Sequence, residues 1–330
     1  NIEELFDLTI HKIGQKADNT TENLKGVQFV VKRTGGEKSG YLKLGSLREI
    51  DMSSHSSGLD ISSYDVDYVE NQEDATKFIT ASNGKIIIKN LEIYSAPGEK
   101  YTYEVCETLN TNYGYKNMVV TKIVGSASNG NIENMTKDIA TRTISFGVNN
   151  RVSGTVYNPT NITVEMYNKQ ELFNLKIHKI GDEVEGDDIN LQNVQFVIGQ
   201  KIDGSVKYFK LASSTTDMLQ ATVSYEGNAN NATQFKTDSN GEIFIKNLEI
   251  YSGIDEKYEY ELCETSNLNY GYKNMELSNI EAGGSIEDPV VDAPNKKVRF
   301  KAENDENSLV DIQLEITNKQ ELFNLKIQKV

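Results

Sequence analysis

A lysine, a glutamate and an asparagine recur at matching places in the two halves of this 330-residue sequence. The six residues are Lys12, Glu107 and Asn168, then Lys179, Glu264 and Asn318. Each extends an alternating row of apolar residues in a β-prone run, as Lys12 does after Leu8 and Ile10. Alternate residues of a strand share a face, so we expect all six side chains to point into a core. Buried charges are costly unless they are paired or neutralised.

Burial would turn these three residue types into a reacting set. A desolvated lysine becomes a neutral amine nucleophile more easily, and a desolvated glutamic acid can stay protonated. A protonated glutamic acid bonded to the asparagine side-chain carbonyl would polarise its carbon. Attack by the amine and loss of ammonia would leave a Lys–Asn isopeptide bond, with Glu107 and Glu264 as the catalytic proton shuttles. The fold supplies the proximity, and the reaction runs once, so we expect self-cross-linking and no enzyme.

A plainer interpretation exists for each residue taken alone. All of them lie near strand ends, where a lysine can extend its ammonium to solvent and a glutamate can pair with it. The presence of all three types in both halves favours the chemical interpretation.

The elements that carry these residues are themselves repeated. From Asn83 to Met118, 27 of 36 positions are identical to the stretch from Asn240 to Met275. Self-similarity on this scale indicates two copies of one fold, so a shared site should appear twice. We expect two similar repeats at 5–170 and 171–320 with no flexible linker between them, and hence a stiff rod.

Strand signals dominate both repeats. The words "KYTYEVCE" and "KYEYELCE" alternate with period two, and Asn-Gly at 83–84 and 240–241 predicts β-hairpins. Several short strands joined by polar turns are typical of a β-sandwich. Residues 47–75 form a polar excursion that is ten residues shorter in the second repeat, and we expect a surface loop there.

The dozen residues around the repeat junction recur at both ends of the sequence. Asn1 occupies the place of the bonding asparagines and Lys329 that of the bonding lysines. We therefore expect 1–4 to close a preceding repeat and 321–330 to provide the first strand of a following one. Asn1 and Lys329 would then be unpaired half-sites in a window of a longer array.

Composition limits the classes of partner. The formal net charge is −15, which argues against nucleic acid and anionic membrane surfaces. No run approaches the roughly 20 apolar residues of a membrane span. Cys106 and Cys263 occupy equivalent places in the two repeats, so we expect no disulfide between them.

Other candidate sites are weaker. His11 and His178 have outward parity, which favours surface roles over catalysis. The acidic residues between 60 and 74 lack a calcium-loop pattern and are absent from the second repeat, so we expect a solvated loop, with a weak ion site as the alternative. We expect no metal and no cofactor, because no phosphate loop, metal-ligand spacing or nucleophile triad appears.

The sequence resembles the B-type repeat domain of Gram-positive collagen adhesins and pilin shafts, the CnaB family. The resemblance covers essentially the whole chain. It consists of a first strand ending in lysine, then "G-x-x-F-x-V", a glutamate before "G-Y", and a last strand ending in asparagine. It implies a β-sandwich of reversed immunoglobulin type and Lys12–Asn168 and Lys179–Asn318 bonds helped by Glu107 and Glu264. The usual proline between the glutamate and Gly-Tyr is missing from both repeats, which leaves the strand register there open.

The resemblance and the residues together predict a structural segment of an extracellular fibre, stalk or pilus shaft. It would belong to a surface or spore appendage of a Gram-positive bacterium. Its partners would be neighbouring repeats and other copies in the fibre. The alternative is a ligand-binding adhesin module that uses long loops such as 47–75. An enzyme is the third hypothesis, and no constellation in the sequence favours it.

Overall fold

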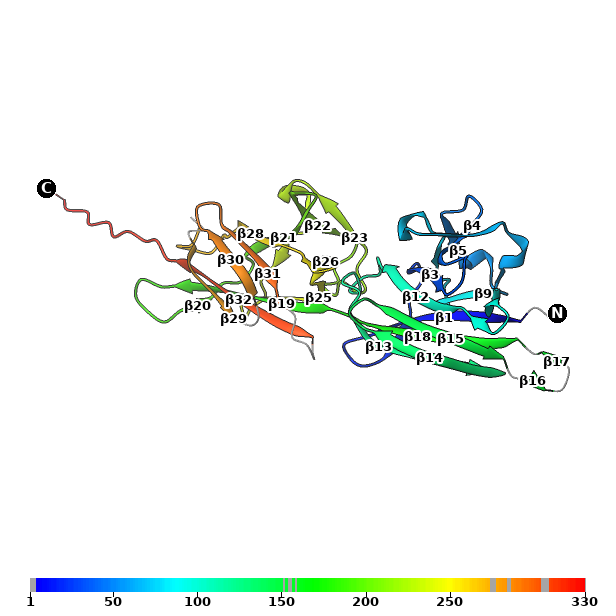
Figure 1. The fold of residues 1–330 in the computed structure, drawn as a ribbon. Coiled ribbons are helices and arrows are strands. Elements are labelled where there is room, and N and C mark those ends of the chain that lie inside the picture. The colour runs from blue at the N-terminus through cyan, green and yellow to red at the C-terminus, as the bar shows by residue number, and fades with distance from the viewer. Residues whose placement is uncertain are drawn as a thin grey trace. The chain divides into compact units, whose positions relative to one another are not determined.

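The chain forms two compact units, 1–170 and 171–330, which we call unit 1 and unit 2. The computed structural model describes residues 4–150, 152–153, 156–157, 159–273, 277–283, 286–303 and 309–329. Both units are built of β-strands packed in layers (Figure 1), which confirms the prediction of all-β, immunoglobulin-like sandwiches. The helices in the described parts are short 3-10 turns: η1 (Met52–Ser54), η2 (Ile61–Ser63), η3 (Gln72–Asp74) and η4 (Ala229–Asn231). Over the described residues, no helix has the length and apolarity needed to cross a membrane.

Unit 1 consists of two main sheets. The first is ordered β13 (Val120–Ser128), β18 (Thr160–Lys169), β1 (Leu5–Gln15), β9 (Lys85–Glu92), β6 (Leu59–Asp60), with β2 (Thr21–Asn23) on β1. The second is ordered β14 (Gly130–Asp138), β15 (Thr143–Asn150), β12 (Thr102–Leu109), β3 (Gln28–Thr34), β4 (Gly40–Leu44), β7 (Val66–Val69), joined by β5 (Glu49–Asp51) and β8 (Lys77–Ile79). Two small ribbons, β10 (Tyr94–Ala96) with β11 (Glu99–Lys100) and β16 (Val152–Ser153) with β17 (Val156–Tyr157), complete it.

Unit 2 repeats this plan. Its first sheet is ordered β20 (Ile189–Asn190), β19 (Leu172–Asp182), β32 (Val310–Lys319), β29 (Leu277–Gly283), with β25 (Glu242–Glu249) on β19. Its second is ordered β23 (Val223–Glu226), β22 (Ser205–Leu211), β21 (Gln195–Ile202), β28 (Tyr260–Ser266), β31 (Lys297–Ala302), β30 (Ile286–Asp292), with β24 (Phe235–Lys236) on β21. A ribbon of β26 (Tyr251–Gly253) and β27 (Glu256–Lys257) is separate.

The first and last strands of each unit lie side by side and parallel. In unit 1, β1 pairs with β18 over ten residue pairs, and Gly14 faces Asn168 in this register (Figure 1). In unit 2, β19 pairs with β32 in the same way, with Gly181 facing Asn318. Strands at the two ends of a unit's sequence are thus held in one sheet.

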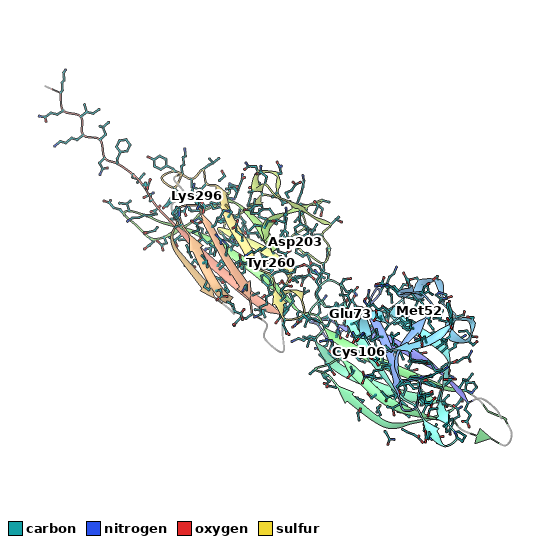
Figure 2. The ribbon with its side chains drawn as sticks, turned by 45° about the horizontal axis from the view of Figure 1, so that its top comes forward. Met52, Glu73, Cys106, Asp203, Tyr260 and Lys296 are labelled. Atoms are coloured by element: carbon teal, nitrogen blue, oxygen red, sulfur yellow. The ribbon has the colours of Figure 1, made fainter. Side chains whose placement is uncertain are left out.

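Apolar residues that alternate along the strands fill the space between the sheets. Phe6, Leu8 and Ile10 of β1 are fully buried, as the parity predicts. Aromatic rings meet across the layers, for example Phe6 with Tyr103 at 4.9 Å between centroids. The counterpart in unit 2 joins Phe173 to Tyr260, which lies among the strands of that unit (Figure 2).

The predicted Asn-Gly hairpins are wrong in their strand pairing. Asn83 and Gly84 form a tight turn, but β8 before it and β9 after it belong to different sheets. The turn carries the chain from one layer to the other, and Gly84 lies against β1, where its carbonyl accepts a hydrogen bond from the Lys12 amide, 2.8 Å away. Asn240 and Gly241 do the same for Lys179.

The prediction of a surface loop at 47–75 is also wrong. This segment contains β5, β6 and β7, and its strands extend both sheets of unit 1. Ile50, Met52, Leu59 and Ile61 are buried in the core. They fall in two pairs, each spaced by two residues, which are too short to form a sustained strand pattern because short strands alternate here with 3-10 turns.

Substitution of Gly84 tests the turn that holds the lysine strand. Gly84 has φ +71°, and an added Cβ would lie 2.6 Å from the Lys12 carbonyl oxygen. Gly98 has φ +81° with open space around it. We expect Gly98→Ala to lose about 1 kcal/mol through its left-handed backbone alone, and Gly84→Ala to lose at least about 2 kcal/mol. Denaturant unfolding measures both, and equal losses would contradict the close approach.

Candidate functional site

Three strands bring the predicted residues of unit 1 together. Lys12 comes from β1 and Asn168 from β18 in one sheet, whereas Glu107 comes from β12 in the facing sheet. The side chains of Lys12 and Glu107 are completely buried, and Asn168 has no exposed surface. The set therefore lies between the layers, shielded from water.

The contacts of this set form a closed ring. Lys12 Nζ donates a hydrogen bond to Glu107 Oε2, 2.8 Å away. Asn168 Nδ2 donates to the other carboxylate oxygen, Oε1, at 2.9 Å. Lys12 Nζ also donates to Asn168 Oδ1. One carboxylate thus contacts both the amine nitrogen and the amide nitrogen.

Unit 2 contains the same ring in a looser form. Lys179 Nζ lies 3.2 Å from Glu264 Oε2, and Asn318 Nδ2 donates to Glu264 Oε1 at 3.1 Å. Lys179 Nζ donates to Asn318 Oδ1 at 2.5 Å and to the Ile316 carbonyl at 3.2 Å. Glu264 Oε2 accepts no hydrogen bond from the part of the chain that the structure describes. The same three residue types therefore converge twice.

The amide orientation differs from the sequence-based expectation. We expected the glutamic acid to bond to the asparagine carbonyl, but in unit 1 that oxygen accepts from Lys12 while Glu107 accepts from the amide nitrogen. The physical reason is that the Lys12 ammonium can only donate hydrogen bonds, whereas the Glu107 carboxylate can only accept them. The amide oxygen therefore faces the lysine and the amide nitrogen faces the glutamate. The carboxylate consequently lies beside the nitrogen that would leave as ammonia.

Burial weakens the hold of both lysines on their protons. It lowers the pKa of Lys12 from 10.5 to about 8, although Glu107 opposes this and Arg142 adds a smaller lowering effect. Burial also lowers the pKa of Lys179 to about 8, again opposed by its glutamate, Glu264. A substantial fraction of each amine is therefore neutral in mildly alkaline solution.

The backbone of each lysine is fixed on both sides. Lys12 donates its amide to the Gly84 carbonyl at 2.8 Å and accepts from the Leu24 amide at 3.1 Å. Lys179 has the equivalent bonds to Gly241 and Leu191. Each Asn-Gly turn that connects the two sheets of a unit therefore positions a lysine. The local sequence alone did not indicate this role.

A tyrosine ring covers the strand next to each asparagine. A Cβ added at Gly14 would lie 2.6 Å from Cζ of Tyr115, and one at Gly181 would lie 2.6 Å from Cζ of Tyr272. Gly14 is the register partner of Asn168, so the ring packs beside the site. We did not predict this role, although the words "KIG" and "YGY" are unchanged in both repeats.

The two half-sites expected at the ends are not assembled in the described residues. Asn1 lies outside them, and Lys329 is exposed on a segment, 320–329, that forms no strand there. His11 and His178 lie on the outer side of their strands and contact Asn23 and Asn190, respectively.

The remaining candidates from the sequence are the two cysteines and the acidic segment. Cys106 and Cys263 are both free and partly buried, and burial raises the pKa of the Cys106 thiol to about 11. The described residues contain no group of three or more metal-ligating side chains. Asp60 is instead bonded to Ser62 and Asn90.

Comparison with known proteins finds distant likeness to pilins. No protein-family model and no curated protein matches the chain. It is similar to the major pilin from Streptococcus pyogenes, with a TM-score of 0.40, 14% identity and coverage of 97% of this chain and 100% of that one. Similarity to the minor pilin from Streptococcus agalactiae has a TM-score of 0.34 and 15% identity, covering 98% and 100%. The shaft pilin from Lactobacillus rhamnosus GG gives 0.31 and 14%, covering 97% and 100%.

The lowered pKa of Lys12 should make the free energy of unfolding depend on pH as long as the amine is unreacted. The Asn168→Ala variant keeps the amine unreacted, because it lacks the amide that Lys12 would attack. Between pH 8 and 10.5 the unfolded chain would hold more protons on Lys12 than the folded chain. The free energy of unfolding should therefore rise with pH in this window, by at most about 3 kcal/mol. Asn168→Ala/Lys12→Met should lack this rise, and identical slopes in urea titrations of the two variants would contradict the lowered pKa.

Proposed function

We propose that each unit closes an internal Lys–Asn isopeptide bond and that the chain is a structural segment of an extracellular fibre, stalk or pilus shaft of a Gram-positive bacterium. The observation that carries the bond is the position of Glu107, whose two oxygens contact the nitrogen that would attack and the nitrogen that would leave. The looser copy at Glu264 supports the same chemistry in unit 2. The segment would assemble with other repeats and other fibre subunits.

The reaction in unit 1 follows from these contacts. The Lys12 ammonium passes a proton to Glu107, and the neutral Nζ attacks Cγ of Asn168. The attacking nitrogen loses a second proton as the C–N bond forms, and the carboxyl group delivers a proton to Nδ2. The bond between Cγ and Nδ2 breaks, and ammonia leaves with the remaining proton as ammonium. Glu107 ends as it began, so one carboxylate serves as base and then as acid.

The site supplies what the uncatalysed reaction lacks. Packing holds amine and amide in contact, which replaces a bimolecular encounter by an intramolecular one and can remove roughly 7–11 kcal/mol of the barrier when alignment is good. Exclusion of water keeps the amine partly neutral and protects the amide from hydrolysis. The product amide would remain in the core with no need for a cofactor.

Intact mass tests the bonds directly. Folded protein should be lighter than its sequence by two molecules of ammonia, because each closure releases one. Glu107→Ala should restore one ammonia and Glu264→Ala the other, since each glutamate serves its own unit. Glu104→Ala, on the outer face of β12, is the matched control and should keep the full loss. A well-folded protein with its complete sequence mass would eliminate the proposal.

Single-molecule pulling tests the fibre role. Lys12 and Asn168 are 156 positions apart, and a bond between them would carry tension past the residues in between. Wild-type units should show no unfolding step before the attachment breaks. Glu107→Ala should release one step of roughly 500 Å from unit 1 alone, the extended length of the shielded residues. Ordinary unfolding steps in the wild type would leave the units as plain spacers.

A further inference from the structure

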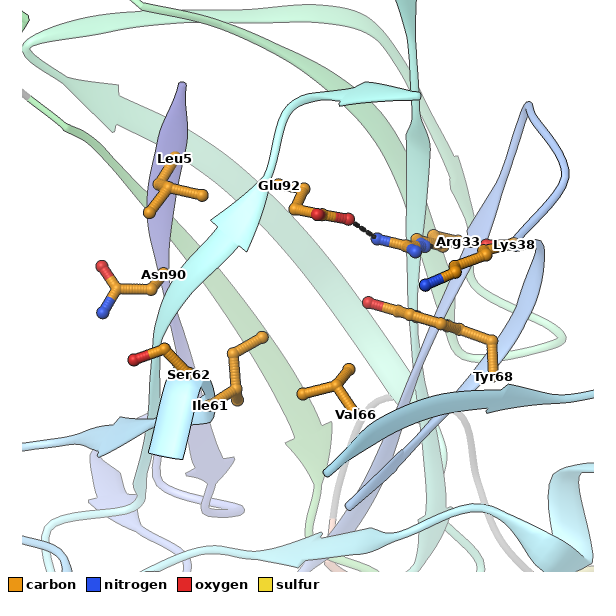
Figure 3. A pocket seen from close by; sticks show the side chains of 9 residues that line it. All are labelled: Leu5, Arg33, Lys38, Ile61, Ser62, Val66, Tyr68, Asn90 and Glu92. Carbon is orange, nitrogen blue, oxygen red and sulfur yellow. Dashed lines mark hydrogen bonds and ion pairs between the residues drawn. The ribbon is translucent and has the colours of Figure 1, made fainter. Parts of the chain in front are cut away.

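Unit 1 contains a small pocket about seven residues along β1 from Lys12. Its volume is about 180 Å³, and one of its lining residues, Leu5, begins β1. Ile61 and Val66 from the 47–75 segment add further apolar surface, and Arg33, Lys38 and Glu92 add charges (Figure 3). Pockets for drug-sized ligands measure roughly 300–1,000 Å³. This pocket therefore suits something of the size of one amino acid.

The guanidinium of Arg33 is the fixed centre of the polar wall. It is 1% exposed and lies between the rings of Tyr68 and Tyr101, at 3.5 and 3.9 Å from their centroids. Its Nη1 donates to Glu92 Oε2 at 2.7 Å, and its Nε donates to the Lys38 carbonyl at 2.8 Å. Glu92 and the Lys38 backbone are thus anchored on one rigid group, close to each other.

The charged groups of Glu92 and Lys38 both remain accessible to a ligand. The side chain of Glu92 is 46% exposed, so a ligand can reach its carboxylate. Lys38 is exposed, and no acid in the described parts of the chain forms an ion pair with its ammonium. The wall therefore presents the carboxylate of Glu92, whose Oε2 already pairs with Arg33, and the ammonium of Lys38 beside an apolar surface.

Unit 2 has a different arrangement at the matching place. Gln200 is the counterpart of Arg33, because it is the cross-strand partner of Tyr260 as Arg33 is of Tyr103. Its amide donates to the Tyr260 hydroxyl at 2.6 Å and accepts from the Tyr225 hydroxyl at 3.1 Å. A neutral, internally bonded group thus replaces the cation. The buried cation at this position is found in one copy of the fold, whereas the lysine sites occur in both, so the pocket is separate from the proposed cross-linking chemistry.

We propose that this pocket of unit 1 binds a free aliphatic α-amino acid. The α-ammonium pairs with Glu92 and the α-carboxylate pairs with Lys38. The side chain packs on Leu5, Ile61 and Val66. A ligand with a single charge would pair with only one of these two groups. A zwitterion can pair with both, because Glu92 and the Lys38 side chain line the same pocket.

Titration of the whole protein with leucine, followed by NMR chemical shifts at neutral pH, tests this site. We expect saturable binding with a Kd on the order of 1 mM. Leucinamide lacks the carboxylate, 4-methylpentanoate lacks the ammonium and glycine lacks the side chain, and each should bind roughly two- to fivefold more weakly or worse. Failure of leucine to saturate, or equal binding of all four, would overturn the proposal.

Variants then locate the binding. Lys38→Ala removes an exposed cation, and Val66→Phe fills the pocket while leaving every charge in place, so both should weaken leucine binding at least roughly fivefold. Lys201→Ala, an exposed cation in unit 2, is the matched control and should bind as wild type. Glu107→Ala should also bind normally, because the pocket does not depend on the isopeptide bond. Unchanged binding in both Lys38→Ala and Val66→Phe, with melting temperatures preserved, would refute the assignment.

Discussion

A lysine amine buried between two apolar sheets is the constraint around which each unit is organised. An isolated ammonium would be far too costly there, so Lys12 requires the carboxylate of Glu107. The second oxygen of that carboxylate is also buried and needs a hydrogen-bond donor, which is the side-chain amide of Asn168. Each group is thus held in place by the other two, and strands β1, β12 and β18 must keep the register that brings them together.

The same constraint explains features that lie outside the ring of three. The parallel pairing of the first and last strands places the lysine and the asparagine of a unit in one sheet, although the sequence separates them by almost the whole unit. The inter-layer glycine turn fixes the lysine backbone, and the tyrosine packed on Gly14 closes the strand beside Asn168. The contacts among the three side chains thus depend on backbone geometry as much as on the residue types.

Strand parity was sufficient to predict the inward direction of Lys12 and its partners, because side-chain alternation is local. Strand pairing depends on residues that are far apart in the sequence. Asn83–Gly84 therefore predicted the turn correctly but not which strands pair on either side of it. The burial within 47–75 escaped prediction because short strands and 3-10 turns break any periodicity. The contact of Tyr115 with Gly14 joins residues far apart in sequence, and only its repetition in unit 2 could have drawn attention to it. The orientation of the Asn168 amide depends on whether Lys12 and Glu107 are charged, and the sequence alone does not determine this.

The parallel pairing of β1 with β18 also sets an order in time. A chain that emerges from its N-terminus presents β1 early, whereas β18 is the last strand of unit 1 to appear. Until then the lysine strand can pair with β9 but lacks β18, which carries the asparagine. The ring of three can assemble only after the complete unit has emerged, so a prematurely ended unit never acquires it. The topology thereby links assembly of this ring to completed synthesis, one unit at a time.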